Sequence, residues 1–171
     1  KFYSNKIIFC SGIGITPFLS IINKQPPNSQ ILLVWSVNNM NMIHEFSDTL
    51  RSLSGTIGLH IVIFYSNSVA QLSQTINVLQ WTKFDFLQTL IHYRLQIDIV
   101  HGVRIPWLII LARAKSADII SRHIKEMNHK QALGIFVCGA QTYVQSIQQA
   151  ADVLKYNSKK IKIDVWSDHL N

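Results

Sequence analysis

Short apolar runs that alternate with stretches of helical periodicity constrain the fold of this chain more than any other feature. The runs are rich in Ile, Val, Leu and Phe, and they fall at residues 7–10, 31–35, 59–65, 97–100, 135–138 and 161–166. Between them, apolar residues recur at helical spacing over 13–23, 42–53, 108–127 and 142–154. Apolar strands that alternate with helices are typical of a parallel sheet covered on both faces. We therefore predict an α/β fold with a doubly wound, mainly parallel sheet.

One long stretch does not fit this alternation. Between residues 67 and 94, seven apolar residues have roughly helical spacing: Leu72, Ile76, Leu79, Phe86, Leu87, Leu90 and Ile91. We interpret this stretch as a helical insertion between the third and fourth strands. The length suits one domain, residues 1–171. Because the first strand pattern begins soon after Lys1, we expect the carboxyl-terminal piece of a larger protein.

The composition excludes several classes of protein. Hydrophobic residues make up 48% of the chain and charged residues 15%, which favours a packed core over disorder. The apolar runs fall far short of the roughly 20 residues that a membrane-spanning helix needs. Two cysteines make neither a disulfide framework nor a zinc site, and the histidines show no metal-ligand spacing. We therefore expect no metal site in this chain.

The net charge of +7 favours an anionic partner: a nucleotide, a nucleic acid or a membrane surface. The densest basic cluster, Lys159, Lys160 and Lys162, is short, and no aromatic residues are interleaved with it. A site for single-stranded nucleic acid would need such aromatic residues for base stacking. We therefore expect no nucleic-acid partner.

A glycine-containing turn, Cys10–Pro17, joins the first predicted strand to the first predicted helix. Gly12 and Gly14 allow a tight turn and a close approach of the backbone to a ligand. We expect Thr16 to be the N-cap of the helix and Pro17 to take the first helical position. The free N–H groups and the helix dipole would then favour a phosphate group. The alternative is an ordinary tight turn between a strand and a helix.

This turn departs from the usual dinucleotide fingerprint, Gly-x-Gly-x-x-Gly. Pro17 stands in place of the third glycine. At the end of the second predicted strand, where an acidic residue would hold the ribose 2′-hydroxyl, the chain has Asn38 and Asn39. The fingerprint alone therefore does not assign a dinucleotide site.

A second candidate turn, Cys138-Gly139-Ala140, follows the fifth predicted strand. Ligands of open α/β sheets bind in the crevice at the carboxyl ends of the strands. We therefore predict that this turn and the turn at Gly12–Gly14 face one nucleotide. The alternative interpretation of Cys138 is a small buried core residue.

The two turns, in this order, resemble a known family. Gly12–Phe18 and the distant pair Cys138-Gly139 are similar to motifs of the NAD(P)H-binding domain of the ferric reductase and NADPH oxidase family. That family belongs to the ferredoxin–NADP reductase superfamily. The resemblance runs from about residue 7 to residue 170, with 67–94 unmatched.

Three segments between the two turns agree with this family. Trp35 ends a strand, as a tryptophan does in the family. Phe46–Leu50 matches the helix in which aromatic residues precede Asp and Leu. His101–Trp107 resembles the family's Gly-Arg-Pro-Asn-Trp segment.

The resemblance implies an electron-input function. In the family, a hydride passes from NADPH or NADH to FAD, which is held by a separate upstream domain. Electrons then reach hemes in a membrane domain, and finally ferric ions, cupric ions or dioxygen. This chain would supply nucleotide binding and orientation at the cytosolic face of a membrane, and FAD and heme would belong to other parts of the protein.

The resemblance also implies roles for individual residues. Those that would cradle the pyrophosphate are Gly12, Gly14, Ile15, Thr16 and Pro17. Cys138 and Gly139 would lie beside the nicotinamide. Cys138 is the candidate catalytic residue, and because hydride transfer needs no nucleophile, it would shape the pocket and would not attack the substrate. Arg104 would pair with the adenosine 2′-phosphate of NADPH. The alternative for Arg104 is a solvated surface arginine.

Several positions depart from the family's pattern. Asn38 replaces the arginine of a Trp-x-x-Arg pattern, which leaves the choice between NADPH and NADH open. Ala140 replaces a proline, and Ile105 interrupts the Arg-Pro-Asn run. Leu170 stands where oxidase members carry an aromatic residue that covers the flavin. Trp166 is either a substitute for that aromatic residue or an ordinary core residue.

Three functions follow from these observations. The first is NAD(P)H binding and hydride donation in a ferric-reductase-like or cupric-reductase-like membrane enzyme. The second is the same step in a superoxide-generating NADPH oxidase. The third is a non-catalytic module that keeps the nucleotide-binding fold; the departures at Asn38 and Leu170 favour it, and the paired glycine turns oppose it.

Overall fold

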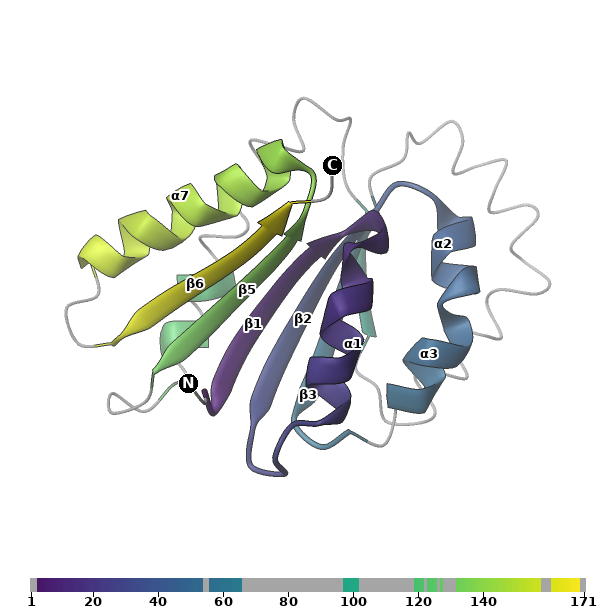
Figure 1. Cartoon of the computed structure of the whole chain (residues 1–171), viewed down its shortest axis with the longest axis horizontal. Coiled ribbons are helices and arrows are strands. Elements are labelled where there is room, and N and C mark those ends of the chain that lie inside the picture. Colours follow the sequence, from purple (N-terminus) through teal and green to yellow (C-terminus); the bar gives the residue numbers. More distant parts are fainter. Residues whose placement is uncertain are drawn as a thin grey trace.

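The computed structural model of the chain describes residues 3–53, 56–65, 97–101, 119–121, 123–125, 127, 132–157 and 161–169. These residues build one six-stranded sheet in the order β4-β3-β2-β1-β5-β6, and every neighbouring pair is parallel (Figure 1). The strands are β1 Asn5–Ser11, β2 Gln30–Val37, β3 Leu59–Tyr65, β4 Ile97–His101, β5 Leu133–Gly139 and β6 Ile163–His169. The predicted doubly wound α/β fold is confirmed.

The helices cover both faces of this sheet. They are the 3-10 turn η1 Gly12–Ile15 and the helices α1 Thr16–Asn23, α2 Met40–Glu45, α3 Ser47–Ser52 and α7 Gln141–Asn157. Figure 1 shows α1 on one face and α7 on the other. The helical pattern predicted over 42–53 is divided at Phe46 into two short helices.

Alternation along the central strand explains why both faces hold a core. On β1, Ile8 and Cys10 point into a cluster under α1, and Ile7 and Phe9 point into a second cluster under α7. All four side chains are buried. A strand that is apolar on both faces can stay buried only in the middle of a covered sheet, which is where β1 lies.

The last strand differs from the prediction because only one of its faces is covered. β6 runs from Ile163 to His169, whereas the apolar pattern predicted 161–166. Asp164, Trp166 and Asp168 lie on the same face of this edge strand. The two acidic residues break the continuous apolar pattern before the strand ends. The prediction from the apolar pattern therefore placed both ends of the strand too early in the sequence.

Two sequence interpretations concern residues that the structure does not describe. The predicted insertion at 67–94 lies outside the described residues. Of the helix predicted over 108–127, the described parts at 119–121 and 123–125 are helical. In the part of the chain that is described, no helix has the length and apolar character needed to span a bilayer.

The core under α1 predicts a clear difference between two truncations. Leu33, on β2, is fully buried, and Val153, on α7, is 53% exposed. Leu33→Ala should lower the free energy of unfolding by about 2–5 kcal/mol, because it removes buried methyl groups and leaves a cavity. Val153→Ala should change it by less than about 0.5 kcal/mol. Urea titrations followed by far-UV circular dichroism measure both, and equal effects would contradict this packing.

Candidate functional site

The order of the strands reverses between β1 and β5. From β1, the chain moves through β2, β3 and β4 on one side, whereas β5 and β6 lie on the other side. The connections after β1 and β5 leave toward opposite faces, with α1 on one and α7 on the other (Figure 1). In open α/β sheets such a reversal point is where ligands bind, at the carboxyl ends of the strands.

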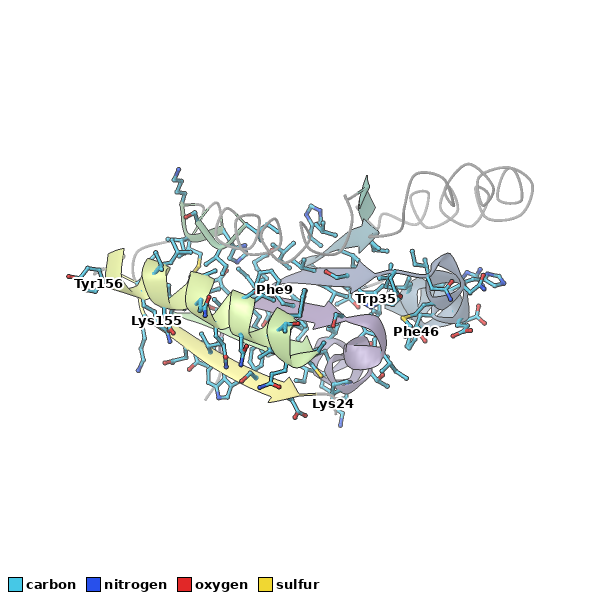
Figure 2. All side chains as sticks on the ribbon, turned by 90° about the horizontal axis from the view of Figure 1, so that it is seen from above. Phe9, Lys24, Trp35, Phe46, Lys155 and Tyr156 are labelled. Atoms are coloured by element: carbon cyan, nitrogen blue, oxygen red, sulfur yellow. The ribbon has the colours of Figure 1, made fainter. Side chains whose placement is uncertain are left out.

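The turn after β1 depends on one left-handed glycine. Gly12 has φ of +54°, and a Cβ at this position would meet no atom closer than 4.0 Å. Its backbone conformation, and not lack of space, therefore requires glycine. The Trp35 indole N–H donates a 2.8 Å hydrogen bond to the Gly12 carbonyl, which ties the turn to β2. The Trp35 ring is itself held edge-on by Phe46, at 5.6 Å between ring centroids (Figure 2).

The turns after β1 and β5 interlock. A Cβ on Gly14 would lie 2.7 Å from the Cys138 carbonyl oxygen, so only glycine lets η1 approach the β5 backbone this closely. A Cβ on Gly139 would collide with the Ser11 hydroxyl oxygen. The two glycine turns therefore lie together at the carboxyl edge of the sheet, and that they face one nucleotide stays a prediction. Ser11 and Gly139 are neighbours that the sequence analysis did not pair.

The predicted cap of the first helix is wrong. Thr16 has helical backbone angles and is the first residue of α1, because the 3-10 turn at Gly12–Ile15 leads into the helix without a break. Its hydroxyl donates back to the Ile13 carbonyl instead of accepting from a free N–H. Pro17 is the second residue of α1, one position later than predicted, and still lies in the first turn. The Ile15 side chain is buried in the core, so only the backbone of this residue could contact a ligand at the turn.

Cys138 has the properties of a neutral pocket residue. It is 1% exposed, and burial, with a smaller contribution from Asp168, raises the pKa of its thiol. Cys10 is its register partner on β1, and burial raises the pKa of that thiol well above its ordinary value. Both thiols stay protonated at neutral pH, which disfavours nucleophilic chemistry.

Tyr143 joins three strand ends, and the sequence analysis missed it. Its hydroxyl donates to the Cys10 carbonyl on β1 and accepts from the Ser36 hydroxyl on β2, at 3.4 and 3.3 Å. Its ring lies against Gly139 of β5. Burial raises the pKa of this phenol, so the hydroxyl stays protonated and available as a donor. No spacing rule links position 143 to β2, and only its place in the first turn of α7 hints at the site.

The end of β2 carries two exposed asparagines. The Asn39 side chain accepts a 2.9 Å hydrogen bond from the Asn41 N–H and so caps α2. Asn38 is exposed beside it. Arg104, the predicted partner of a 2′-phosphate, lies outside the described residues.

Trp166 lies in the middle of β6 and not at its carboxyl end. Its ring stacks on Phe136 and meets Tyr3 edge-on, both at 4.9 Å between centroids, and the residue remains 40% exposed. It is three residues from the end of the strand, about 10 Å along it, so it lies away from the carboxyl ends of the strands. Leu170 lies outside the described residues.

Within the described ranges, no three His, Cys, Asp or Glu residues come together as a set that could hold a metal ion.

The model of one known protein family matches most of the chain. Residues 3–152 match the model of a family described as the ferric reductase NAD binding domain. The chain belongs to this family. The resemblance to this family inferred from the two turns is therefore confirmed. No curated protein matches the chain.

A solved structure at 18% sequence identity shows the same fold. A ferredoxin NADP+ reductase from Neisseria gonorrhoeae with bound FAD and NADP matches at 18% identity and a TM-score of 0.51, over 95% of this chain and 56% of the other. The flavohem-like FAD/NAD binding domain of a nitric oxide dioxygenase from Vibrio cholerae O1 matches at 14% identity and a TM-score of 0.49, over 98% and 53%. The chain thus spans about half the length of each.

The interlocked turns predict which glycine substitution can be rescued. Gly139→Ala should lower the free energy of unfolding by about 1–3 kcal/mol, because the new methyl group meets the Ser11 side chain. Adding Ser11→Gly should restore part of that loss. Gly14→Ala should cost a similar amount but gain nothing from Ser11→Gly, because it meets the Cys138 backbone. Urea titrations of the four variants measure the coupling, and equal rescue of both would contradict this contact pattern.

The raised thiol pKa of Cys10 predicts a loss of stability at alkaline pH. As the pH rises past the ordinary thiol pKa, the unfolded chain releases its proton before the folded chain does, so the folded state loses stability. Between about pH 7 and about pH 10, the free energy of unfolding should fall by about 1 kcal/mol or more through this group. Cys10→Ala should show a shallower fall in urea titrations across this range, and an identical slope would contradict the burial of the thiol.

Proposed function

We propose that this chain binds NADPH or NADH at the carboxyl ends of β1 and β5 and presents the nicotinamide to a flavin held by another domain of the same protein. Bound NAD(P)H supplies the hydride. The observation that carries the proposal is the interlock of the two glycine turns, which leaves the backbone of both turns at one edge of the sheet. The family match supports the choice of ligand.

The turn after β1 is suited to the pyrophosphate. Helical turns leave their first N–H groups without partners inside the helix, and these groups point toward an anion at the N-terminus. Gly12–Ile15 and Thr16–Asn23 form one continuous helical path that begins at the carboxyl end of β1. Gly12 keeps side-chain atoms away from this approach, and the Trp35 bond holds the turn in place. Backbone groups would therefore do most of the binding.

The turn after β5 is suited to the nicotinamide. Gly139 packs directly against the Ser11 side chain, and Cys138, the residue before it, has a neutral thiol. A neutral, apolar surface suits a ring that gives up a hydride and needs no nucleophile from the protein. Cys138 would shape the pocket and exclude water from it. Tyr143 would hold the turn after β5 in place through its hydrogen bonds to β1 and β2.

The electron route beyond this domain forms part of the proposal. We infer a ferric-reductase-like or cupric-reductase-like enzyme, in which FAD and heme lie in other domains and this domain works at the cytosolic face of a membrane. The family description supports the metalloreductase assignment. The bound FAD and NADP of the Neisseria gonorrhoeae reductase support a pairing of this fold with a flavin.

Isothermal titration calorimetry of the chain with NADH and with NADPH tests the first step. At least one should bind with a Kd of about 1 mM or tighter, equivalent to about −4 kcal/mol. Gly14→Ala should weaken that binding at least about tenfold, because it moves η1 away from Cys138. Val153→Ala, on the outer surface of α7, is the matched control and should bind like the parent. A folded chain that binds neither nucleotide would overturn the proposal and favour a non-catalytic module.

A further inference from the structure

The side chain of Tyr143 connects three strands at their carboxyl ends. Tyr143 is the third residue of α7, the helix that follows β5. Its hydroxyl donates to the Cys10 carbonyl of β1 at 3.4 Å and accepts from the Ser36 hydroxyl of β2 at 3.3 Å. Because β1 lies between β5 and β2 in the sheet, the phenol reaches from the helix after β5 across the end of β1. A single side chain thus ties the turn after β5 to both β1 and β2.

The ring of the same side chain packs on the turn at Gly139. A Cβ on Gly139 would lie 3.2 Å from Cδ1 of the Tyr143 ring, and it would collide with the Ser11 hydroxyl oxygen. The Tyr143 ring and the Ser11 side chain therefore both pack on the side of Gly139 where a side chain would project. The Val144 N–H donates a 3.0 Å hydrogen bond to the Ala140 carbonyl, so the turn continues directly into α7. The position of Gly139 thus depends on where the Tyr143 ring lies.

The hydroxyl is fixed by its partners and by its protonation state. Burial raises the pKa of the phenol, so the group stays protonated at neutral pH and donates to the Cys10 carbonyl. Cys10 is the next-to-last residue of β1, and Ser36 is the next-to-last residue of β2. Both partners therefore lie at the edge of the sheet where ligands of open α/β folds bind. A change in this hydroxyl would act at that edge and not in the middle of the core.

We propose that Tyr143 is a positioning residue for the nicotinamide half of the bound dinucleotide. This inference rests on the proposed function, in which the nicotinamide lies at the turn after β5. The hydroxyl holds the Tyr143 ring and the ring holds Gly139, so removing the hydroxyl should loosen the packing at this turn. The turn after β1 is held by the Trp35 hydrogen bond to the Gly12 carbonyl, which does not involve Tyr143. The contacts to the pyrophosphate should therefore persist when the hydroxyl is removed.

Calorimetric titrations with two ligands that differ only in the nicotinamide ring test this role. The ligands are NADH and ADP-ribose, or NADPH and 2′-phospho-ADP-ribose where the parent chain binds NADPH more tightly. The parent should bind the complete dinucleotide at least about fivefold more tightly than the truncated ligand. Tyr143→Phe keeps the ring and removes the hydroxyl. It should reduce this preference to about twofold or less by weakening the complete dinucleotide, while the affinity for the truncated ligand stays within about twofold of the parent.

Two further variants separate positioning from general support of the fold. Tyr156→Phe is the matched control, because it is the same substitution on the same helix at a residue that is 85% exposed near the end of α7 (Figure 2). It should change neither affinity. Ser36→Ala removes the donor to the phenol oxygen and should cause a smaller loss of the same kind. The double variant of Tyr143→Phe and Ser36→Ala should lose no more than Tyr143→Phe alone, because the two residues share one hydrogen bond.

The outcomes separate this inference from the proposed function. If Tyr143→Phe weakens both ligands equally, or weakens neither, Tyr143 does not position the nicotinamide and the inference is wrong. A parent chain that binds both ligands equally tightly also overturns it, while nucleotide binding stands. If Tyr143→Phe does not fold, the selective loss expected of Ser36→Ala decides the question in the same way. If no nucleotide binds to the folded parent chain, the proposed function fails and this inference fails with it.

Discussion

The contact between the turns after β1 and β5 is the constraint on which the rest of the site depends. Gly14 lies against the Cys138 backbone, and Gly139 lies against Ser11, so neither turn can move without the other. The two strands meet where the chain reverses its direction across the sheet, and the helices that follow them leave toward opposite faces. The two turns can pack edge to edge because glycines stand at both contact points.

A site built in this way relies on backbone groups more than on side chains. Trp35 donates to the Gly12 carbonyl and Tyr143 to the Cys10 carbonyl, both close to the carboxyl end of β1. Cys138 contributes a neutral, buried thiol. This arrangement suits a ligand with a central pyrophosphate and two ring systems. Among the described residues, Lys6, Lys24, Arg51, Lys155 and Lys162 lie toward the amino-terminal edge of the sheet, away from both turns.

The strands and both glycine turns were predictable because apolar runs and glycines leave strong local signals. The end of β6 was not, because Asp164 and Asp168 on its open face break the apolar pattern. Thr16 has the residue type of an N-cap, yet the preceding 3-10 turn already supplies the helical path. Tyr143 was missed because its partners on β1 and β2 are more than 100 positions away, and only the fold brings them together.

The most direct test of the central claim is to follow the backbone amides of the ¹⁵N-labelled chain by NMR during titration with NADH. The account predicts that the amides of Gly12–Thr16 and of Cys138-Gly139 shift together, with the same apparent Kd, because the two turns form one site. Shifts confined to one turn, or centred on the amino-terminal edge of the sheet, would contradict it.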